Sequence, residues 1–193
     1  MEKLSTILML YLLGFATEIP TALGFDKRPG AVHSWLKNLP NLKEKVALFH
    51  FYLHDIIGGN NPTSYTVAEA KISATSPTHY GLIRVMDDPL TIGPEPDSNI
   101  IGRVQGTNGG SSLEEIGLLM ILNFLFVEGE YNGSTLSVLG RDALLDEYRE
   151  MPIVGGTGVF RLARGIITAQ TVWFNMTTED AVLELTATVL YYE

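Results

Sequence analysis

Short apolar and β-branched segments follow one another along most of this chain, separated by turn residues and with little helical periodicity. Asn132-Gly133 is typical of a type I′ hairpin, and residues 177–180 predict a second turn. Strands are predicted at 46–57, 65–72, 80–87, 100–107, 115–127, 134–142, 159–173 and 181–192. Eight strands without intervening helices predict an all-β fold, an eight-stranded antiparallel up-and-down β-barrel, in which closure removes exposed edges. A β-sandwich is the alternative.

The segment before the first strand divides into two parts. In residues 1–24, Lys3 precedes an apolar run at 7–13, and small residues follow at Ala22 and Gly24. This run is too short to span a bilayer and is typical of a signal peptide, which we expect to be cleaved after Gly24. An N-terminal arm is the alternative. Residues 25–44 are predicted to form an irregular arm, because prolines and Gly30 interrupt any helix, and residues 45–193 the barrel domain.

Composition and sequons favour a secreted, extracellular chain. Asn132 and Asn175 each begin an Asn-x-Ser/Thr glycosylation sequon. The chain has no cysteine, so a secreted protein of this kind depends on its core rather than on disulfides. Its 193 residues are enough for one domain with such a core. A formal net charge of −9 without a Lys/Arg cluster argues against a nucleic-acid partner.

Residues 116–122 are apolar at every position except Gly117, so this strand has two apolar faces. In a closed barrel one face points outward, and an outward apolar stripe is typical of a partner surface. We therefore expect a homo-oligomer. Cover by the N-terminal arm would account for the same pattern.

Two aspartates stand in phase with apolar strand faces. Asp55 continues the alternation of Phe51 and Leu53, and Asp142 continues that of Leu136 and Val138. Arg149 follows closely enough to return over the barrel mouth. Two acids and an arginine in an apolar interior would have displaced pKa values, which are a usual mark of acid–base catalysis. A structural ion pair plus a turn aspartate accounts for the same residues.

No cofactor or metal site is predicted. The four histidines lack zinc-ligand spacing, and His54, opposite in phase to Asp55, is interpreted as structural or exposed. The glycine-rich residues 154–158 resemble a phosphate loop, but a strand rather than a helix is predicted after them. We interpret them as a tight turn that requires a positive φ.

Several motifs, taken in order, resemble those of plant dirigent proteins. They are Leu53-His54-Asp55-Ile56, Asp87-Asp88-Pro89-Leu90, Gly102-Arg103-Val104-Gln105-Gly106, Gly140-Arg141-Asp142-Ala143-Leu144 and the run 149–160 with Ala163-Arg164-Gly165. The resemblance covers the chain from about residue 45 to its end. It implies a secreted, glycosylated, usually oligomeric barrel in the apoplast.

The same resemblance implies a function. The barrel would bind phenolic radicals or a quinone methide and direct their stereoselective coupling or cyclisation, with oxidation supplied by a separate laccase or peroxidase. The family's pocket residues correspond to Asp55, Asp142 and Arg149. Ala143 and the stretch Thr107-Asn108-Gly109-Gly110 depart from the pinoresinol-forming pattern and are more like the branch with pterocarpan synthases. An isoflavanol dehydratase without oxidative activity, and a cell-wall binding or structural module, are the alternative functions.

Overall fold

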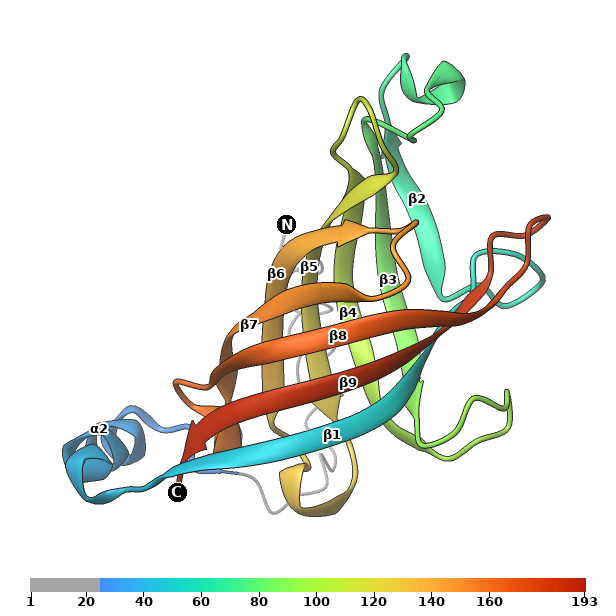
Figure 1. The fold of residues 1–193 in the computed structure, drawn as a ribbon. Helices are drawn as coiled ribbons and strands as arrows, with labels where there is room; N and C mark the ends of the chain where they lie inside the picture. Colours follow the sequence, from blue (N-terminus) through green and yellow to red (C-terminus); the bar gives the residue numbers. More distant parts are fainter. Residues whose placement is uncertain (1–24) are drawn as a thin grey trace, which may run out of the picture.

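The computed structural model describes residues 25–193, and the predicted signal peptide lies outside them. Nine strands make up most of the described chain (Figure 1). Their bounds are β1 Glu44–Asp55, β2 Ser64–Glu69, β3 Leu82–Thr91, β4 Ile100–Gly110, β5 Gly117–Phe126, β6 Thr135–Ala143, β7 Arg149–Thr157, β8 Arg164–Phe174 and β9 Ala181–Tyr192. Helix α2 spans Pro29–Asn38, and 3-10 turns occupy η1 Leu39–Asn41, η2 Ser73–Thr75, η3 Gly129–Tyr131 and η4 Gly158–Phe160.

The sheet closes into a barrel. Its strand order is β1-β9-β8-β7-β6-β5-β4-β3-β2, and β1 also pairs with β3 through Tyr52↔Thr91 and Leu53↔Leu90. All of these strand pairs are antiparallel, so eight strands form a closed ring and β2 continues outside it. The predicted eight-stranded antiparallel barrel is confirmed, and the β-sandwich is excluded.

The membership of the ring differs from the prediction in two strands. The segment predicted at 65–72 is the extra strand β2, whereas β7, which had no predicted strand, belongs to the ring. Gly155 and Gly156 lie in β7 and not in a turn, and among the glycines of residues 154–158 only Gly158 has a positive φ, of 69°. A Cβ on Gly156 would lie 2.5 Å from the Thr135 carbonyl oxygen, so close strand contact requires this glycine.

Two local predictions are also corrected. Asn132 has φ −51° and ψ 131°, and Gly133 has φ 79°, which are the angles of a type II rather than a type I′ turn. The arm predicted as irregular contains α2, with Pro29 in the first turn, where the proline's missing N–H breaks no helical hydrogen bond. Pro40 lies after this helix, in η1. The turn predicted between the last two strands is confirmed.

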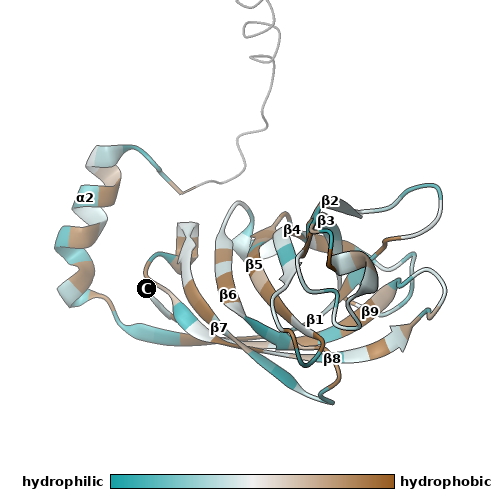
Figure 2. Ribbon diagram, turned by 90° about the horizontal axis from the view of Figure 1, so that it is seen from above, coloured by the Kyte–Doolittle hydropathy of each residue, from teal (hydrophilic) through white to brown (hydrophobic). Residues whose placement is uncertain are grey.

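Helix α2 stands beside the barrel, near the start of β1, and none of its residues is buried (Figure 2). None of the helices in residues 25–193 is long and apolar enough to cross a membrane.

The two ends of the barrel interior differ in chemistry. The end that holds the start of β1 is filled by an aromatic cluster, in which Phe160 packs 5.1 Å from Tyr131 and 5.5 Å from Tyr191, measured between ring centroids. Phe49 and Phe126 complete it, 5.3 Å apart. Arg149 and Asp142 lie toward the opposite end, where β6 ends and β7 begins. The buried charged side chains of the interior therefore lie in the middle of the barrel and toward the end opposite the aromatic cluster.

An apolar row crosses the outside of the sheet. Tyr65, Val85, Thr107, Ile121 and Leu139 are register partners on neighbouring strands from β2 to β6. All but Thr107 are exposed apolar side chains. The outward apolar face predicted for residues 116–122 therefore exists, and what covers it remains a prediction.

Candidate functional site

Polar atoms without a protein hydrogen-bond partner gather inside the barrel. In the described residues such buried side-chain atoms belong to Asp55, Ser64, Arg84, Asp88, Asn108, Asp142 and Arg149. Buried polar groups are normally hydrogen-bonded, so each exception calls for an explanation. A concentration of them on the inner face of one sheet is typical of a site that binds a polar ligand.

Asp142 and Arg149 form the first part of this site. Arg149 Nε lies 2.9 Å from Asp142 Oδ1, and the two side chains are 1% and 2% exposed. The N–H is not aligned with that oxygen, so the contact is an ion pair rather than a good hydrogen bond. Arg149 Nη1 donates to Thr171 Oγ1 at 2.8 Å. The sequence predicted that Arg149 returns toward the two inward-facing acids, and Asp142 is the one of the two that it contacts.

Burial dominates the electrostatics of Asp142. It raises the pKa of this carboxyl, while the guanidinium of Arg149 and then that of Arg141 act in the opposite direction. The carboxyl therefore protonates more readily than an exposed aspartate despite its ion pair. A phenolic oxygen that reached this point would meet a cation and a readily protonated acid.

Asp55 and Asp88 form the second part. Asp55 ends β1, and Asp88 lies in β3 with no exposed surface. Continuing the pairs Tyr52↔Thr91 and Leu53↔Leu90 by two residues sets Asp55 opposite Asp88 across the seam that closes the barrel. Thr63 donates its hydroxyl to Asp88 Oδ1 at 2.6 Å.

Both carboxyls of this pair are harder to ionise than ordinary aspartates. Burial raises the pKa of Asp55 to about 6, against the smaller lowering effects of Arg84 and then Ser64. Burial and next the charge of Asp55 raise the pKa of Asp88 to about 8. The Ser64 hydroxyl makes no hydrogen bond with a protein group, so its influence on Asp55 is weak.

The predicted residues thus divide between the two parts. In residues 25–193, no hydrogen bond or ion pair joins Asp55 to Asp142 or Arg149. Phe174 pairs with Ala181 and Ala181 with Asp55, so Phe174 shares the inner face with Asp55 from two strands away. The Phe174 side chain is 49% exposed, so its ring remains largely accessible.

Sequence reasoning missed Asp88, Arg84 and Asn108. The signal for Asp88 was present, because Met86, Asp88 and Leu90 alternate in the same way as the residues before Asp55. All three of these β3 residues are buried. Arg84 and Asn108 carry no comparable signal, since they become neighbours only through the pairing of β3 with β4.

His54 is structural, one of the two predicted readings. It is 7% exposed, and its Nε2 lies 2.8 Å from Thr91 Oγ1 across the seam. Burial lowers the pKa of this imidazole, so the neutral form is favoured.

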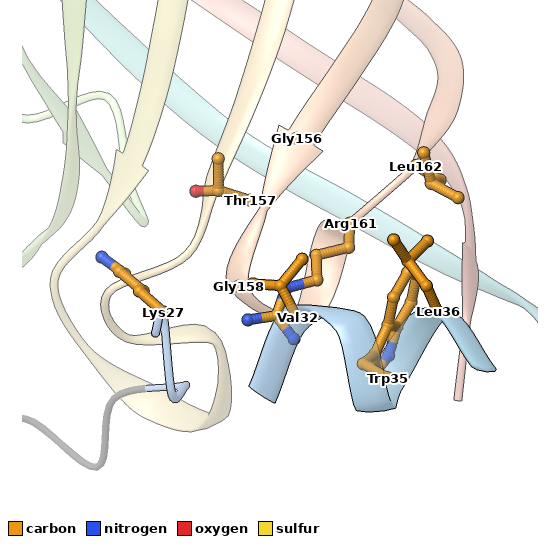
Figure 3. A pocket seen from close by; sticks show the side chains of 9 residues that line it. All are labelled: Lys27, Val32, Trp35, Leu36, Gly156, Thr157, Gly158, Arg161 and Leu162. Atoms are coloured by element: carbon orange, nitrogen blue, oxygen red, sulfur yellow. The ribbon is translucent and has the colours of Figure 1, made fainter. Parts of the chain in front are cut away.

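A separate cleft of about 460 Å³ lies between α2 and the turn after β7 (Figure 3). Arg161 lies over the Trp35 ring there, 5.6 Å from its centroid, and Lys27 lines the same cleft. None of the inward carboxylates reaches this cleft, which is outside the barrel at its aromatic end. It is not the candidate site.

The two sequon asparagines lie in loops. Asn132 is half-buried in the turn before β6. Asn175 is half-buried between β8 and β9, and its Oδ1 accepts the Thr177 N–H at 2.9 Å. Whether either carries a glycan remains a prediction.

The interior of an eight-stranded barrel is either filled by side chains or holds one small ligand, and the inner face of this barrel carries buried acids. Residues 46–190 match the family described as Dirigent-like protein. The chain belongs to the dirigent family.

Its relatives include members with and without a named product. Dirigent protein 23 of Arabidopsis thaliana is 43% identical over 161 residues, 83% of this chain and 86% of that protein. Pterocarpan synthase 1 of Glycyrrhiza echinata is 41% identical over 174 residues, 90% of this chain and 84% of that protein. The solved structure of the pterocarpan synthase dirigent protein GePTS1 superposes with a TM-score of 0.74 at 44% identity, covering 78% of this chain and 87% of that one.

Proposed function

We propose that this protein binds a phenolic radical or quinone methide inside its barrel and directs its stereoselective coupling or cyclisation. The observation that carries the proposal is that Asp55, Asp88 and Asp142 each bury one carboxyl oxygen that accepts no hydrogen bond from the protein. Family membership supports a small phenolic substrate. Oxidation would come from a separate laccase or peroxidase.

The geometry supports a division of roles. Arg149, already held by Asp142, would bind a phenolate or quinone methide oxygen, as a fixed cation stabilises developing negative charge. Asp55 and Asp142 would exchange protons with phenolic oxygens, an effect worth about 10²–10⁴-fold in rate. Holding the reacting groups in one orientation would select the face that reacts.

The test is product handedness. A laccase would generate radicals from a panel of phenols, with and without the protein, and chiral chromatography would measure enantiomeric excess. We expect an excess with the wild-type protein and racemic product with Asp55→Asn or Asp142→Asn. Asp97→Asn is the matched control, because Asp97 is exposed and the charge change is the same. Racemic wild-type product with every phenol would refute radical coupling.

The second candidate is an isoflavanol dehydratase, favoured by the 41% identity to a pterocarpan synthase together with the raised pKa values of the inner carboxyls. One acid would protonate the leaving hydroxyl, which departs as water. A second group would accept the proton of the phenol that closes the ring. Incubation with an isoflavanol in the absence of any oxidase decides, since product would establish turnover and its absence would leave the coupling function. If neither activity is found, the wall-binding module is favoured.

We further propose that residues 1–24 direct the chain to the apoplast and that Asn132 and Asn175 are glycosylated. The outer apolar row from Tyr65 to Leu139 supports a homo-oligomer, because such a row on a monomer would stay in water. Light scattering of the secreted protein would test the homo-oligomer. Its intact mass would test the removal of residues 1–24 and the glycosylation of Asn132 and Asn175.

A further inference from the structure

The pair formed by Asp55 and Asp88 sits at a special place in the barrel. Both belong to strands that meet only through the short β1–β3 seam, and both continue inward-facing series of apolar residues. Residues directly opposite in an antiparallel pair have Cβ atoms about 5 Å apart, and like charges in that arrangement repel. In a buried setting the repulsion is stronger than in water.

The cations around the pair already have partners. Arg84, from β3, donates to Glu179 of the β8–β9 loop at 2.6 Å. Arg103, from β4, donates to the exposed Asp87 through Nε at 2.5 Å. Each of these arginines therefore has an acid of its own in addition to the buried pair.

The remaining neighbours do not add positive charge. Ser64 and Thr63 contribute only hydroxyls from the start of β2, and Asp180 uses its Oδ1 to accept the Ile57 and Gly58 N–H groups at 2.7 and 2.8 Å. The β8–β9 loop thus brings two acids, Glu179 and Asp180, toward Asp55. If Asp55 and Asp88 were both ionised, the second negative charge would have no cation that lacks another acidic partner.

We propose that Asp55 and Asp88 act as one carboxyl pair that holds a single proton at neutral pH, with Asp88 keeping the proton and Asp55 facing the substrate. Asp88 is a positioning residue in this arrangement. It sets the charge state of Asp55 without contacting the reacting atoms.

Burial decides which member keeps the proton. Asp88 has no exposed surface and only a neutral hydroxyl as donor, whereas Asp55 is partly exposed and lies near Arg84. Ionisation is therefore easier at Asp55, and the negative charge formed there opposes ionisation of Asp88. The higher pKa of Asp88, about 8 against about 6 for Asp55, agrees with this order.

The consequence for turnover rests on the proposed function. A singly protonated pair presents an ionised Asp55 to accept a phenolic proton, and the same proton returns to the product oxygen or to water when the ring closes. The pair ends the cycle with the one proton it had at the start. Activity should then depend on pH through two ionisations of the pair.

The primary test needs no substrate. Aspartate carboxyl ¹³C shifts of the full folded chain, followed by NMR from pH 4 to 10, should show two inner carboxyls titrating in separate steps, near pH 6 and near pH 8. The wild-type titration alone can overturn the proposal: it is wrong if Asp55 and Asp88 both ionise below pH 5.

Variants give a reciprocal test. Asp55→Asn removes the opposing charge, so the pKa of Asp88 should fall by about 1 unit or more. Asp88→Asn mimics the protonated acid, so the upper step should vanish while the step of Asp55 stays near its wild-type position. Asp142→Asn is the matched control, since it removes another buried aspartate and should leave both steps unmoved. An Asp88 titration that is the same with and without Asp55 contradicts the sharing of a proton.

Turnover supplies the separate test of the role. Wild-type activity should fall above about pH 8, and the ratio of activity at pH 9 to activity at pH 7 should be higher in Asp88→Asn than in the wild type, because the variant lacks the alkaline limb. A retained alkaline limb in Asp88→Asn would contradict the positioning role even where NMR shows the shared proton. If no substrate turns over, the NMR result still decides the charge state, so failure of the proposed function is distinguishable.

Discussion

The two parts of the inner site each bury a carboxyl, but in opposite electrostatic environments. Asp142 is buried against a cation, Arg149, at 2.9 Å, whereas Asp88 is buried against another acid, Asp55. Both carboxyls are almost inaccessible to water. The first pair can remain charged because opposite charges compensate, and the second can hold only one charge at moderate cost. Burial raises the pKa of both carboxyls, and the nearest charge then separates them: a cation opposes the rise at Asp142, whereas a second acid adds to it at Asp88.

The largest expected effect comes from breaking the ion pair. Arg149→Met leaves Asp142 as a buried carboxyl without a cation, which should lower the free energy of unfolding by about 3–5 kcal/mol. Urea unfolding at pH 7 measures it. The double variant Asp142→Leu with Arg149→Met should recover most of the loss, because two apolar side chains replace the whole pair. A double variant as unstable as the single one would contradict the compensation.

A smaller effect of opposite sign is expected from Asp88→Asn. The pKa of Asp88 is about 8 in the folded protein and about 3.8 when unfolded, so the folded state binds more protons between these values. The contribution of Asp88 to the free energy of unfolding is therefore fully present below pH 4 and is lost as the pH rises toward 8. Asp88→Asn removes the loss and should stabilise the protein at pH 8 by on the order of 1–3 kcal/mol, since one pKa unit is worth about 1.4 kcal/mol.

The measurement is the difference in unfolding free energy between the two proteins at pH 4 and at pH 8. The gain should be small at pH 4 and grow with pH. Asp97→Asn serves again as the exposed control and should show no such growth. A gain that is the same at both pH values would show that the effect comes from packing rather than from ionisation.

The smallest expected effect is at Arg141, the sequence neighbour of Asp142. Arg141 pairs with Glu115 on the outside of the sheet, where the two side chains are 53% and 60% exposed. Exposed pairs contribute little, so Arg141→Met should change the unfolding free energy by less than about 0.5 kcal/mol in the same urea experiment. If Arg141→Met lowered the unfolding free energy nearly as much as Arg149→Met, burial would not explain the difference expected between the two arginines.

Much of the fold was accessible to sequence reasoning because strand alternation is a local signal. It placed Asp55 and Asp142 on inner faces and predicted the closed antiparallel barrel. It failed at β7, where Pro152 and the paired glycines are usually signs of a turn, although close strand contact requires Gly156 there. It failed at α2 because Pro29 was treated as a helix breaker and not as a first-turn residue.

The sequence by itself determined that two acids face the interior and that the chain resembles dirigent proteins. Only the tertiary structure decided which groups these acids meet. Asp55 and Asp88 are 33 residues apart (88 minus 55) and become neighbours through the β1–β3 seam, which forms only when the whole ring closes. Register across such a seam depends on the stagger accumulated by all the strands, and no local pattern records it. For that reason Asp142 and Arg149, joined by one short connection, could be paired from the sequence, while Asp88 could not be assigned to Asp55.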